Sequence, residues 1–440
     1  MHTLADLRAG KLAGIKRLDL SCGLTEFPPE IFDLADSLEV LNLSGNALDS
    51  LPPDLHRLHR LEVLFGSDNR FTELPACIGQ CQRLRIVGFK ANRIRHVPAQ
   101  ALPPALGWLI LTDNCIESLP DELGRRPQLQ KLMLAGNRLT QLPDLSACHR
   151  LELLRIAANR LTRLPRWLLD LPALAWLAHG DNPLSAAPTP RTIREIAWND
   201  LDLQQRLGEG ASGVIQQAQW RNGETLLPVA VKLYKGDVTS DGSPLSEMAA
   251  CITAGVHPQL IDVLGRIDRH PEGTRGLVME LIAPSFVNLA GPPSLDSCTR
   301  DIYGPDMRMS LAALLRLASG IASVTAHLHA RGITHGDLYG HNILWQADGR
   351  CLLGDFGAAS FLPDTAVDSQ TSAALQRIET RAFGILLGEL LDRCDHPAGE
   401  TGIPDQLRQL EMECGQADAG LRPLMAEVSA RLQTICKAAP

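Results

Sequence analysis

Leu-Glu-Val-Leu-Asn-Leu-Ser-Gly-Asn, residues 38–46, decides the architecture of the first half of the chain, because this stretch recurs with little change. The asparagine that closes it returns at steps of 22 or 23 residues. These asparagines are Asn46, Asn69, Asn92, Asn114, Asn137, Asn159 and Asn182. Gly23 takes the same place one period earlier, so the sequence predicts eight stacked units.

A short strand explains the paired leucines of each unit. Side chains alternate along a strand, so Leu41 and Leu43 point to the same side and would enter a shared core. The asparagine is expected to bond buried backbone groups at the following turn. An apolar–Pro pair such as Leu51-Pro52 follows in most units. The pattern resembles the cytoplasmic, LPxxL-containing leucine-rich repeats, over about residues 12–188.

In leucine-rich repeats, the strand positions between the leucines face outward on the concave surface. In this chain they are apolar for a surface, and they include aromatic residues and arginine, which are typical of protein-binding sites. The residues predicted to bind a protein ligand are Phe65, Trp108, Arg155 and Trp176. The alternative is that this face packs against the second half of the chain.

Composition narrows the classes of function. The chain has 440 residues, so two or three domains are expected, and its net charge of −8 argues against nucleic-acid or membrane-surface partners. No segment has the pattern of a secretory signal or of an apolar membrane span. Eleven scattered cysteines without a CxxC pair fit reduced thiols. A cytoplasmic protein is predicted.

Proline interrupts the repeat near residue 188. Pro183, Pro188 and Pro190, with small residues between them, are typical of a linker. The predicted organisation is a repeat domain at 1–188, a linker at 189–197 and a second domain at 198–436.

A different series of signals follows, in a fixed order. Each is weak alone, but all of them at these distances are not expected by chance. The series is Gly-Glu-Gly-Ala-Ser-Gly at 208–213, Val-Ala-Val-Lys at 229–232, Glu247, Leu-Val-Met-Glu-Leu at 277–281, His-Gly-Asp-Leu-Tyr-Gly-His-Asn at 335–342, and Asp-Phe-Gly at 355–357. Glu247 falls in a helix that Ser243 would cap and Pro244 would begin.

The series resembles the eukaryotic-type protein kinase family over about residues 200–435, and within it the tyrosine-kinase-like group and bacterial leucine-rich repeat kinases. The resemblance predicts a multidomain α/β plus α+β protein, with a horseshoe solenoid followed by a bilobal kinase-like domain. It implies ATP and Mg²⁺ as cofactors and a protein substrate, with serine or threonine as the default acceptor.

The family's roles carry over onto matching positions. The resemblance implies that Asp337 takes the proton of the acceptor hydroxyl, that Lys232 paired with Glu247 clamps the phosphates, and that Asn342 and Asp355 hold the metal. The residues implied to surround ATP are Gly208, Gly210, Gly213, Ala230, Lys232, Met279, Glu280 and Leu281.

The match also departs from the family pattern. Gly336 replaces the arginine of HRD, Tyr339 stands where serine/threonine kinases place a lysine, and Glu379 replaces an aspartate. The segment from Gly357 to Glu379 lacks an APE motif, so Arg422 loses its usual glutamate partner. A nucleotide-binding pseudokinase scaffold, or a small-molecule phosphotransferase, therefore stays open as an alternative.

Hydroxyl residues after the Asp-Phe-Gly motif are candidate autophosphorylation sites. They are Ser360, Thr365, Ser369, Thr371 and Ser372. The alternative is an ordinary solvated loop.

Overall fold

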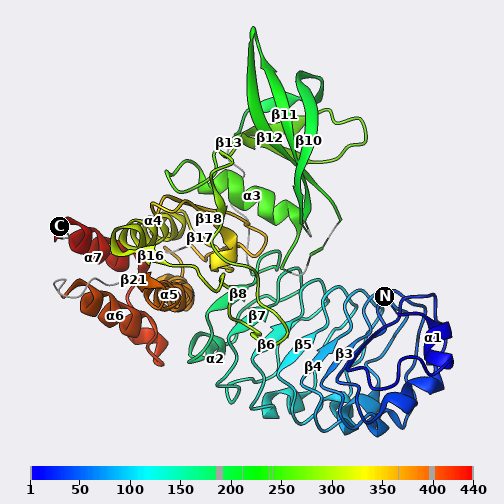
Figure 1. Ribbon diagram of the computed structural model, residues 1–440. Helices are drawn as coiled ribbons and strands as arrows, with labels where there is room; N and C mark the ends of the chain where they lie inside the picture. Colours follow the sequence, from blue (N-terminus) through cyan, green and yellow to red (C-terminus); the bar gives the residue numbers. More distant parts are fainter. Residues whose placement is uncertain are drawn as a thin grey trace. The chain divides into compact units, whose positions relative to one another are not determined.

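The computed structural model describes residues 2–184, 192–210, 212–236, 238–239, 241–364, 366–395 and 402–438 (Figure 1). Contacts divide the chain into two compact units. The first contains residues 1–173 and 182–184, and the second contains residues 174–181 and 185–440. The short segment 174–181 therefore groups with the second unit, although its sequence continues the repeat.

The first unit is a stack of coils, each of which contributes one three-residue strand to a parallel sheet (Figure 1). The strands are β1 (Arg17–Asp19), β2 (Val40–Asn42), β3 (Val63–Phe65), β4 (Ile86–Gly88), β5 (Trp108–Ile110), β6 (Lys131–Met133) and β7 (Leu153–Arg155). Equivalent repeat positions pair in register, as Val40 does with Val63. The leucine-rich repeat solenoid predicted from the sequence is confirmed.

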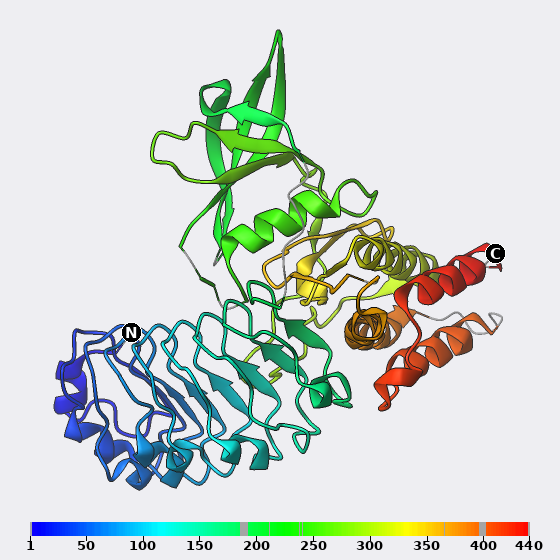
Figure 2. The same ribbon diagram turned by 180° about the vertical axis from the view of Figure 1, so that it is seen from behind.

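Short helices form the opposite side of the coils, as the view from behind also shows (Figure 2). Most are 3₁₀ helices of three to six residues, since a coil of 22 or 23 residues leaves little length for a helix. They are α1 (Leu4–Arg8), η1 (Pro29–Leu34), η2 (Leu55–Arg57), η3 (Ala76–Gln80), η4 (Ala99–Ala101), η5 (Asp121–Arg125) and α2 (Arg166–Leu169).

The asparagine ladder closes each coil. In Asn137, Nδ2 donates to the carbonyl oxygens of Leu111 at 2.9 Å and Leu134 at 3.0 Å, and Oδ1 accepts from the amide of Ile116 at 3.0 Å. Asn137 is 7% exposed, so these bonds satisfy backbone groups that water does not reach. The predicted role of the asparagines is confirmed.

A left-handed residue precedes each ladder asparagine. Its φ lies between 51° and 73° at Gly45, Asp68, Ala91, Asp113, Gly136, Ala158 and Asp181. Only two of the seven are glycine, although a side chain costs roughly 1–2 kcal/mol in this conformation. The buried ladder bonds hold the other five in place.

The second unit begins with a six-stranded sheet in the order β10-β11-β12-β14-β13-β9. Its strands are β9 (Glu195–Ala197), β10 (Leu201–Glu209), β11 (Gly213–Asn222), β12 (Thr225–Tyr234), β13 (Val263–Asp268) and β14 (Gly276–Glu280). Residues 195–197 were assigned to the linker from the sequence, but they pair in parallel with β13. Residues 189–191 of that linker lie outside the described residues.

Helix α3 (Pro244–Ala254) packs beside this sheet (Figure 1). Ser243 caps it, since Ser243 Oγ accepts from the amide of Ser246 at 3.1 Å, and Pro244 occupies its first turn. Both features were predicted from the sequence and both are confirmed.

The rest of the second unit is mainly helical. Its elements are β8 (Trp176–Ala178), η6 (Trp198–Asp200), β15 (Val287–Asn288), β16 (Met309–Ser310), α4 (Leu311–Ala330), β17 (Ile333–Thr334), η7 (Gly340–Asn342), β18 (Ile343–Trp345), β19 (Cys351–Leu353), β20 (Ser360–Phe361), α5 (Ser369–Leu391), β21 (Cys394–Asp395), α6 (Ile403–Cys414), η8 (Ala419–Leu421) and α7 (Met425–Ala438). Helix α4 is long and apolar enough to cross a membrane, but most of it is buried within this unit, as expected of a core helix.

Candidate active site

The lysine of the Val-Ala-Val-Lys strand forms an ion pair with the acid of helix α3. Lys232 Nζ contacts Glu247 Oε1, and their side chains are only 13% and 2% exposed. Burial disfavours the charged lysine, but the neighbouring carboxylate outweighs burial, so the pKa of Lys232 is raised. The helix cap at Ser243 fixes the start of α3, and Glu247 lies in its first turn.

The three glycines at the β10–β11 turn have different surroundings. A Cβ on Gly213 would lie 2.3 Å from the carbonyl oxygen of Leu233, so a side chain does not fit there. A Cβ on Gly208 or Gly210 would meet nothing within 4 Å. Packing within the protein therefore does not require these two glycines, and the space beside them can accept a ligand.

A cavity of about 90 Å³ lies behind the ion pair. Its lining includes Lys232, Glu247, Met279, Asp355 and Phe356. Met279 pairs with Ala230 across β12 and β14, which places these two residues at the same level of the sheet. Glu280 and Leu281 follow at the end of β14, and the amide of Glu280 donates to Asp262 O at 2.9 Å.

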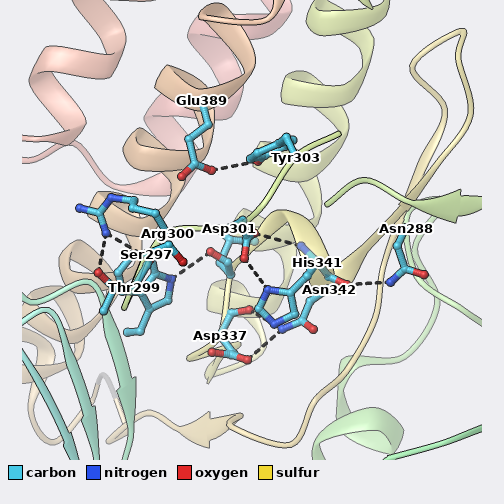
Figure 3. A network of polar contacts seen from close by, with 12 residues as sticks. Asn288, Ser297, Thr299, Arg300, Asp301, Tyr303, Asp337, His341, Asn342 and Glu389 are labelled. Carbon is cyan, nitrogen blue, oxygen red and sulfur yellow. Dashed lines mark hydrogen bonds and ion pairs between the residues drawn. The ribbon is translucent and has the colours of Figure 1, made fainter. Parts of the chain in front are cut away.

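The loop between β17 and β18 brings Asp337 and Asn342 together, as Figure 3 shows. Asn342 Nδ2 donates to both the backbone oxygen and Oδ2 of Asp337, each at 2.9 Å. The Asp-Phe-Gly segment adjoins this loop, because the amide of Gly354 donates to Asn342 O and His335 Nε2 donates to Gly354 O. Asp355 has a φ of 52°, a strained conformation that is typical of functional sites.

The pKa of His341 responds to the charges around this loop. Burial would lower its pKa, but the hydrogen bond to Asp301 and the charges of Asp337 and Asp355 raise it overall. Asp355 also contributes to the raised pKa of Lys232. The charge of Asp355 therefore acts on the ion pair and on residues 335–342, the catalytic loop that the family resemblance implies, so the structure brings these predicted site residues into one site.

Glu379, which departs from the aspartate of the family pattern, has a defined position in the structure. Its Oε1 accepts from the amide of Gly336 at 2.6 Å, and its Oε2 accepts from His329 Nε2 at 2.7 Å. Burial favours the protonated acid, but the hydrogen bonds outweigh it and lower the pKa of Glu379. Glu379 therefore ties the central helix α5 to helix α4 and to the catalytic loop.

Gly336 is required by its surroundings. Its φ is 74°, and a Cβ would lie 2.5 Å from Ala358 O and 2.8 Å from Leu177 O. An arginine at this position would have to displace two backbone carbonyls. The close approach of Ala358 and of Leu177 in segment 174–181 therefore leaves no room for an arginine at this position.

Trp176 from the same segment covers Tyr339. The two rings stack at 4.2 Å and 7°, and Trp176 Nε1 donates to Leu338 O at 3.0 Å. Trp176 and Arg155 are only 1% and 2% exposed, so the prediction that they offer a free protein-binding surface is wrong. The sequence pattern gave their repeat position but not their burial. Phe65 and Trp108 remain partly exposed.

Segment 174–181 also contacts β20 and helix α3. The amides of His179 and Gly180 donate to Ser360 Oγ at 2.9 and 3.0 Å, and Ser246 Oγ donates to Asp181 Oδ1 at 2.6 Å. Ser360 is 1% exposed and Ser372 is fully buried, so neither hydroxyl is accessible as a phosphorylation site. Ser369 is exposed and Thr371 is half-buried, while Thr365 lies outside the described residues.

The segment between β20 and α5 is short, because only residues 362–368 separate them. Arg422 donates to the carbonyl oxygens of Gln416 at 2.8 Å and Arg377 at 3.4 Å. Burial lowers the pKa of Arg422 to about 10. The arginine is thus held by backbone carbonyls.

A second acid on α5 is perturbed in the opposite direction from Glu379. Tyr303 donates to Glu389 Oε2 at 2.9 Å (Figure 3). Burial is the main cause that raises the pKa of Glu389 to about 7, and the charge of Asp301 adds to it.

A six-stranded sheet followed by a mainly helical part, with this ion pair, catalytic loop and Asp-Phe-Gly segment, is the arrangement of a protein kinase domain. Residues 201–414 match the protein tyrosine and serine/threonine kinase family, and residues 37–58 match the leucine-rich repeat. The chain therefore combines leucine-rich repeats with a protein kinase domain of this family, as the sequence predicted.

Similar proteins include kinases of both acceptor types. The chain is 27% identical over 291 residues to the tyrosine-protein kinase Abl of Drosophila melanogaster, covering 57% of this chain and 16% of the relative. It is 29% identical over 195 residues to the LRR receptor-like serine/threonine-protein kinase GSO2 of Arabidopsis thaliana, covering 41% and 15%. For the probable serine/threonine-protein kinase PkwA of Thermomonospora curvata the identity is 26%, covering 53% and 34%. The chain thus spans only about a sixth of the length of the first two relatives.

We expect Gly336→Ala to lower thermal stability more than Gly332→Ala does. Both glycines have a φ near 70°, so both variants carry the left-handed penalty of roughly 1–2 kcal/mol. Only Gly336 would also place a Cβ against two carbonyl oxygens, because Gly332 has nothing within 4 Å. Calorimetric melting of both variants measures the difference, and equal losses would contradict the close approach.

Glu389→Gln is expected to change how stability depends on pH. The folded-state pKa of about 7 exceeds the ordinary 4.5, so the folded protein binds more protons between these values and loses stability as pH rises through them. The uncharged variant avoids this loss, which amounts to at most about 3 kcal/mol at pH 8. Melting temperatures at pH 5 and 8 test this: parallel curves for the two proteins would exclude it.

Proposed function

We propose that the chain is an ATP-dependent protein kinase that transfers a phosphoryl group to protein hydroxyls. The observation that carries the proposal is the convergence of the Lys232–Glu247 ion pair with the Asp337–Asn342 hydrogen bonds and Asp355. Phosphoryl transfer requires positioning and charge neutralisation more than covalent chemistry, and these groups supply both.

In this proposal each residue has a defined task. Lys232, kept charged and oriented by Glu247, binds the phosphates, and the open space beside Gly208 and Gly210 admits them. Asp337, oriented by the amide of Asn342, accepts the proton of the attacking hydroxyl through its carboxylate. Ala230, Met279, Glu280 and Leu281 would line the adenine pocket.

The donor set suits Mg²⁺. Asp355 offers a carboxylate, and Asn342, whose Nδ2 is engaged by Asp337, offers its amide oxygen. Among the described residues, no cluster of three or more His, Cys, Asp or Glu side chains is arranged to hold a metal alone. This fits an ion that shares its oxygens with phosphates, as Mg²⁺ does in kinase sites, where it neutralises the charge that develops.

We propose serine or threonine as the acceptor, with support from the names of two of the relatives described above. Abl, which is named a tyrosine kinase, supports the other choice. Analysis of the phosphorylated amino acid in the product decides between them.

A specific observation favours a second candidate. Only residues 362–368 link β20 to α5, and Trp176 covers Tyr339. Little structure is therefore left to bind a peptide substrate. A nucleotide-binding scaffold without turnover, or a small-molecule phosphotransferase, would not need such a platform.

We expect the intact protein to label a generic protein acceptor with radioactive ATP and Mg²⁺. Asp337→Asn and Asp355→Asn should each reduce the rate by about 100-fold or more, because base and metal ligand act on the transition state. Asp405→Asn, an exposed acid in the first turn of α6, is the matched control. Absent label together with an ATP-induced rise in melting temperature would instead support the scaffold.

We propose that the repeats bind a protein ligand through their concave face, at the partly exposed Phe65 and Trp108. Lys131 Nζ lies 4.1 Å from the centre of the Trp108 ring, which fixes the ring in place. Proteins recovered from the source lysate with the wild type should be lost with Phe65→Ala/Trp108→Ala. They should be retained with His56→Ala, which changes an exposed residue of helix η2. Unchanged recovery with the double variant would contradict the proposal.

A cytoplasmic location is likewise our proposal, supported by the scattered cysteines and the net charge of −8. Relatives include receptor kinases, so fractionation of the source cells is the deciding measurement.

A further inference from the structure

The residue before Asn342 is held at three of its atoms by residues outside the kinase motifs. His341 Nδ1 donates to Asp301 Oδ1 at 2.7 Å, and the backbone amide of His341 donates to Asp301 Oδ2 at 3.0 Å. Its backbone oxygen accepts from Asn288 Nδ2 at 2.9 Å, as Figure 3 shows. The peptides on both sides of His341, and its ring, therefore have little freedom to rotate.

Asp301 is suited to hold this loop. Its side chain is completely buried, and both carboxylate oxygens are used by the same residue, which fixes direction as well as distance. A buried carboxylate without such partners would be strongly unfavourable. The burial of Asp301 therefore favours its two hydrogen bonds to His341.

The segment around Asp301 is itself anchored. Gly291 and Ile302 exchange two backbone hydrogen bonds, at 2.7 and 2.9 Å, and Tyr303 donates to Glu389 on helix α5. A Cβ on Gly340 would lie 2.7 Å from Tyr303 Oη and 3.1 Å from Asp301 Oδ2, so the segment lies directly against the catalytic loop. The central helix thus supports the loop through Tyr303 and Asp301.

Asn342 depends on this support. Its Nδ2 faces Asp337, which leaves Oδ1 as the atom that can bind a cation. The direction of Oδ1 follows from the backbone of Asn342. Its preceding peptide is held by Asn288 and follows directly on His341, which Asp301 holds at the backbone amide and at the ring. Partners that orient a metal ligand usually contribute about 10–100-fold to metal affinity or activity.

We propose that Asp301 is a positioning residue that aims Oδ1 of Asn342 at the metal ion of the nucleotide complex. The inference rests on the proposed function, since it takes Asn342 as a metal ligand. It adds a residue that lies outside the kinase motifs, between β15 and α4.

The test measures metal binding directly in the full-length protein. Mn²⁺ is titrated in the presence of a non-hydrolysable ATP analogue and followed by electron paramagnetic resonance. We expect Asp301→Asn to raise the dissociation constant for Mn²⁺ about 10-fold. The Mg²⁺ concentration for half-maximal phosphoryl transfer should rise in parallel. Asp306→Asn makes the same chemical change at an exposed position of the same segment and should leave both values within about 2-fold of wild type.

His341→Ala provides a second variant if Asp301→Asn fails to fold. It removes the bond at Nδ1 but keeps the backbone amide bond to Asp301, so a smaller rise in the Mn²⁺ dissociation constant, about 3-fold, is expected. Unchanged Mn²⁺ affinity in folded Asp301→Asn protein, with only a lower melting temperature, would overturn the inference. A wild type that binds Mn²⁺ and nucleotide without transferring phosphate would refute the proposed activity but leave the positioning role measurable.

Discussion

The kinase site depends on the hydrogen bonds that the buried carboxylate of Glu379 accepts. It accepts hydrogen bonds from His329 on α4 and from the amide of Gly336 in the catalytic loop, and its side chain is only 3% exposed. A charged group at this depth is tolerated only because its partners satisfy it. Helices α4 and α5 and the catalytic loop are therefore fixed relative to one another before any ligand binds.

The same loop is held from two further directions. Asp301 clasps His341 from the segment that precedes α4, and Trp176 stacks on Tyr339. All three contacts are intrinsic to the folded chain. These contacts hold the loop although Gly336 stands where the family motif has an arginine.

Segment 174–181 continues the repeat in its sequence, but in the folded chain it approaches Gly336, Ser360 and the start of α3. These positions belong to the catalytic loop, to the strand after Asp-Phe-Gly and to the helix that carries Glu247. A single short segment therefore touches three elements whose relative positions determine whether the ion pair and the loop are aligned.

The repeat, the kinase motifs and the cap of α3 could be predicted from the sequence, because these features depend on spacing and local chemistry. Fixed steps between asparagines require stacked coils, and Ser243-Pro244 specifies a helix start without help from distant residues. Only the tertiary structure decided that Trp176, Arg155 and Ser360 are buried and that Asp301 and Glu379 hold the catalytic loop. Burial and long-range hydrogen bonds depend on which distant surfaces meet, and no local pattern in the chain records that.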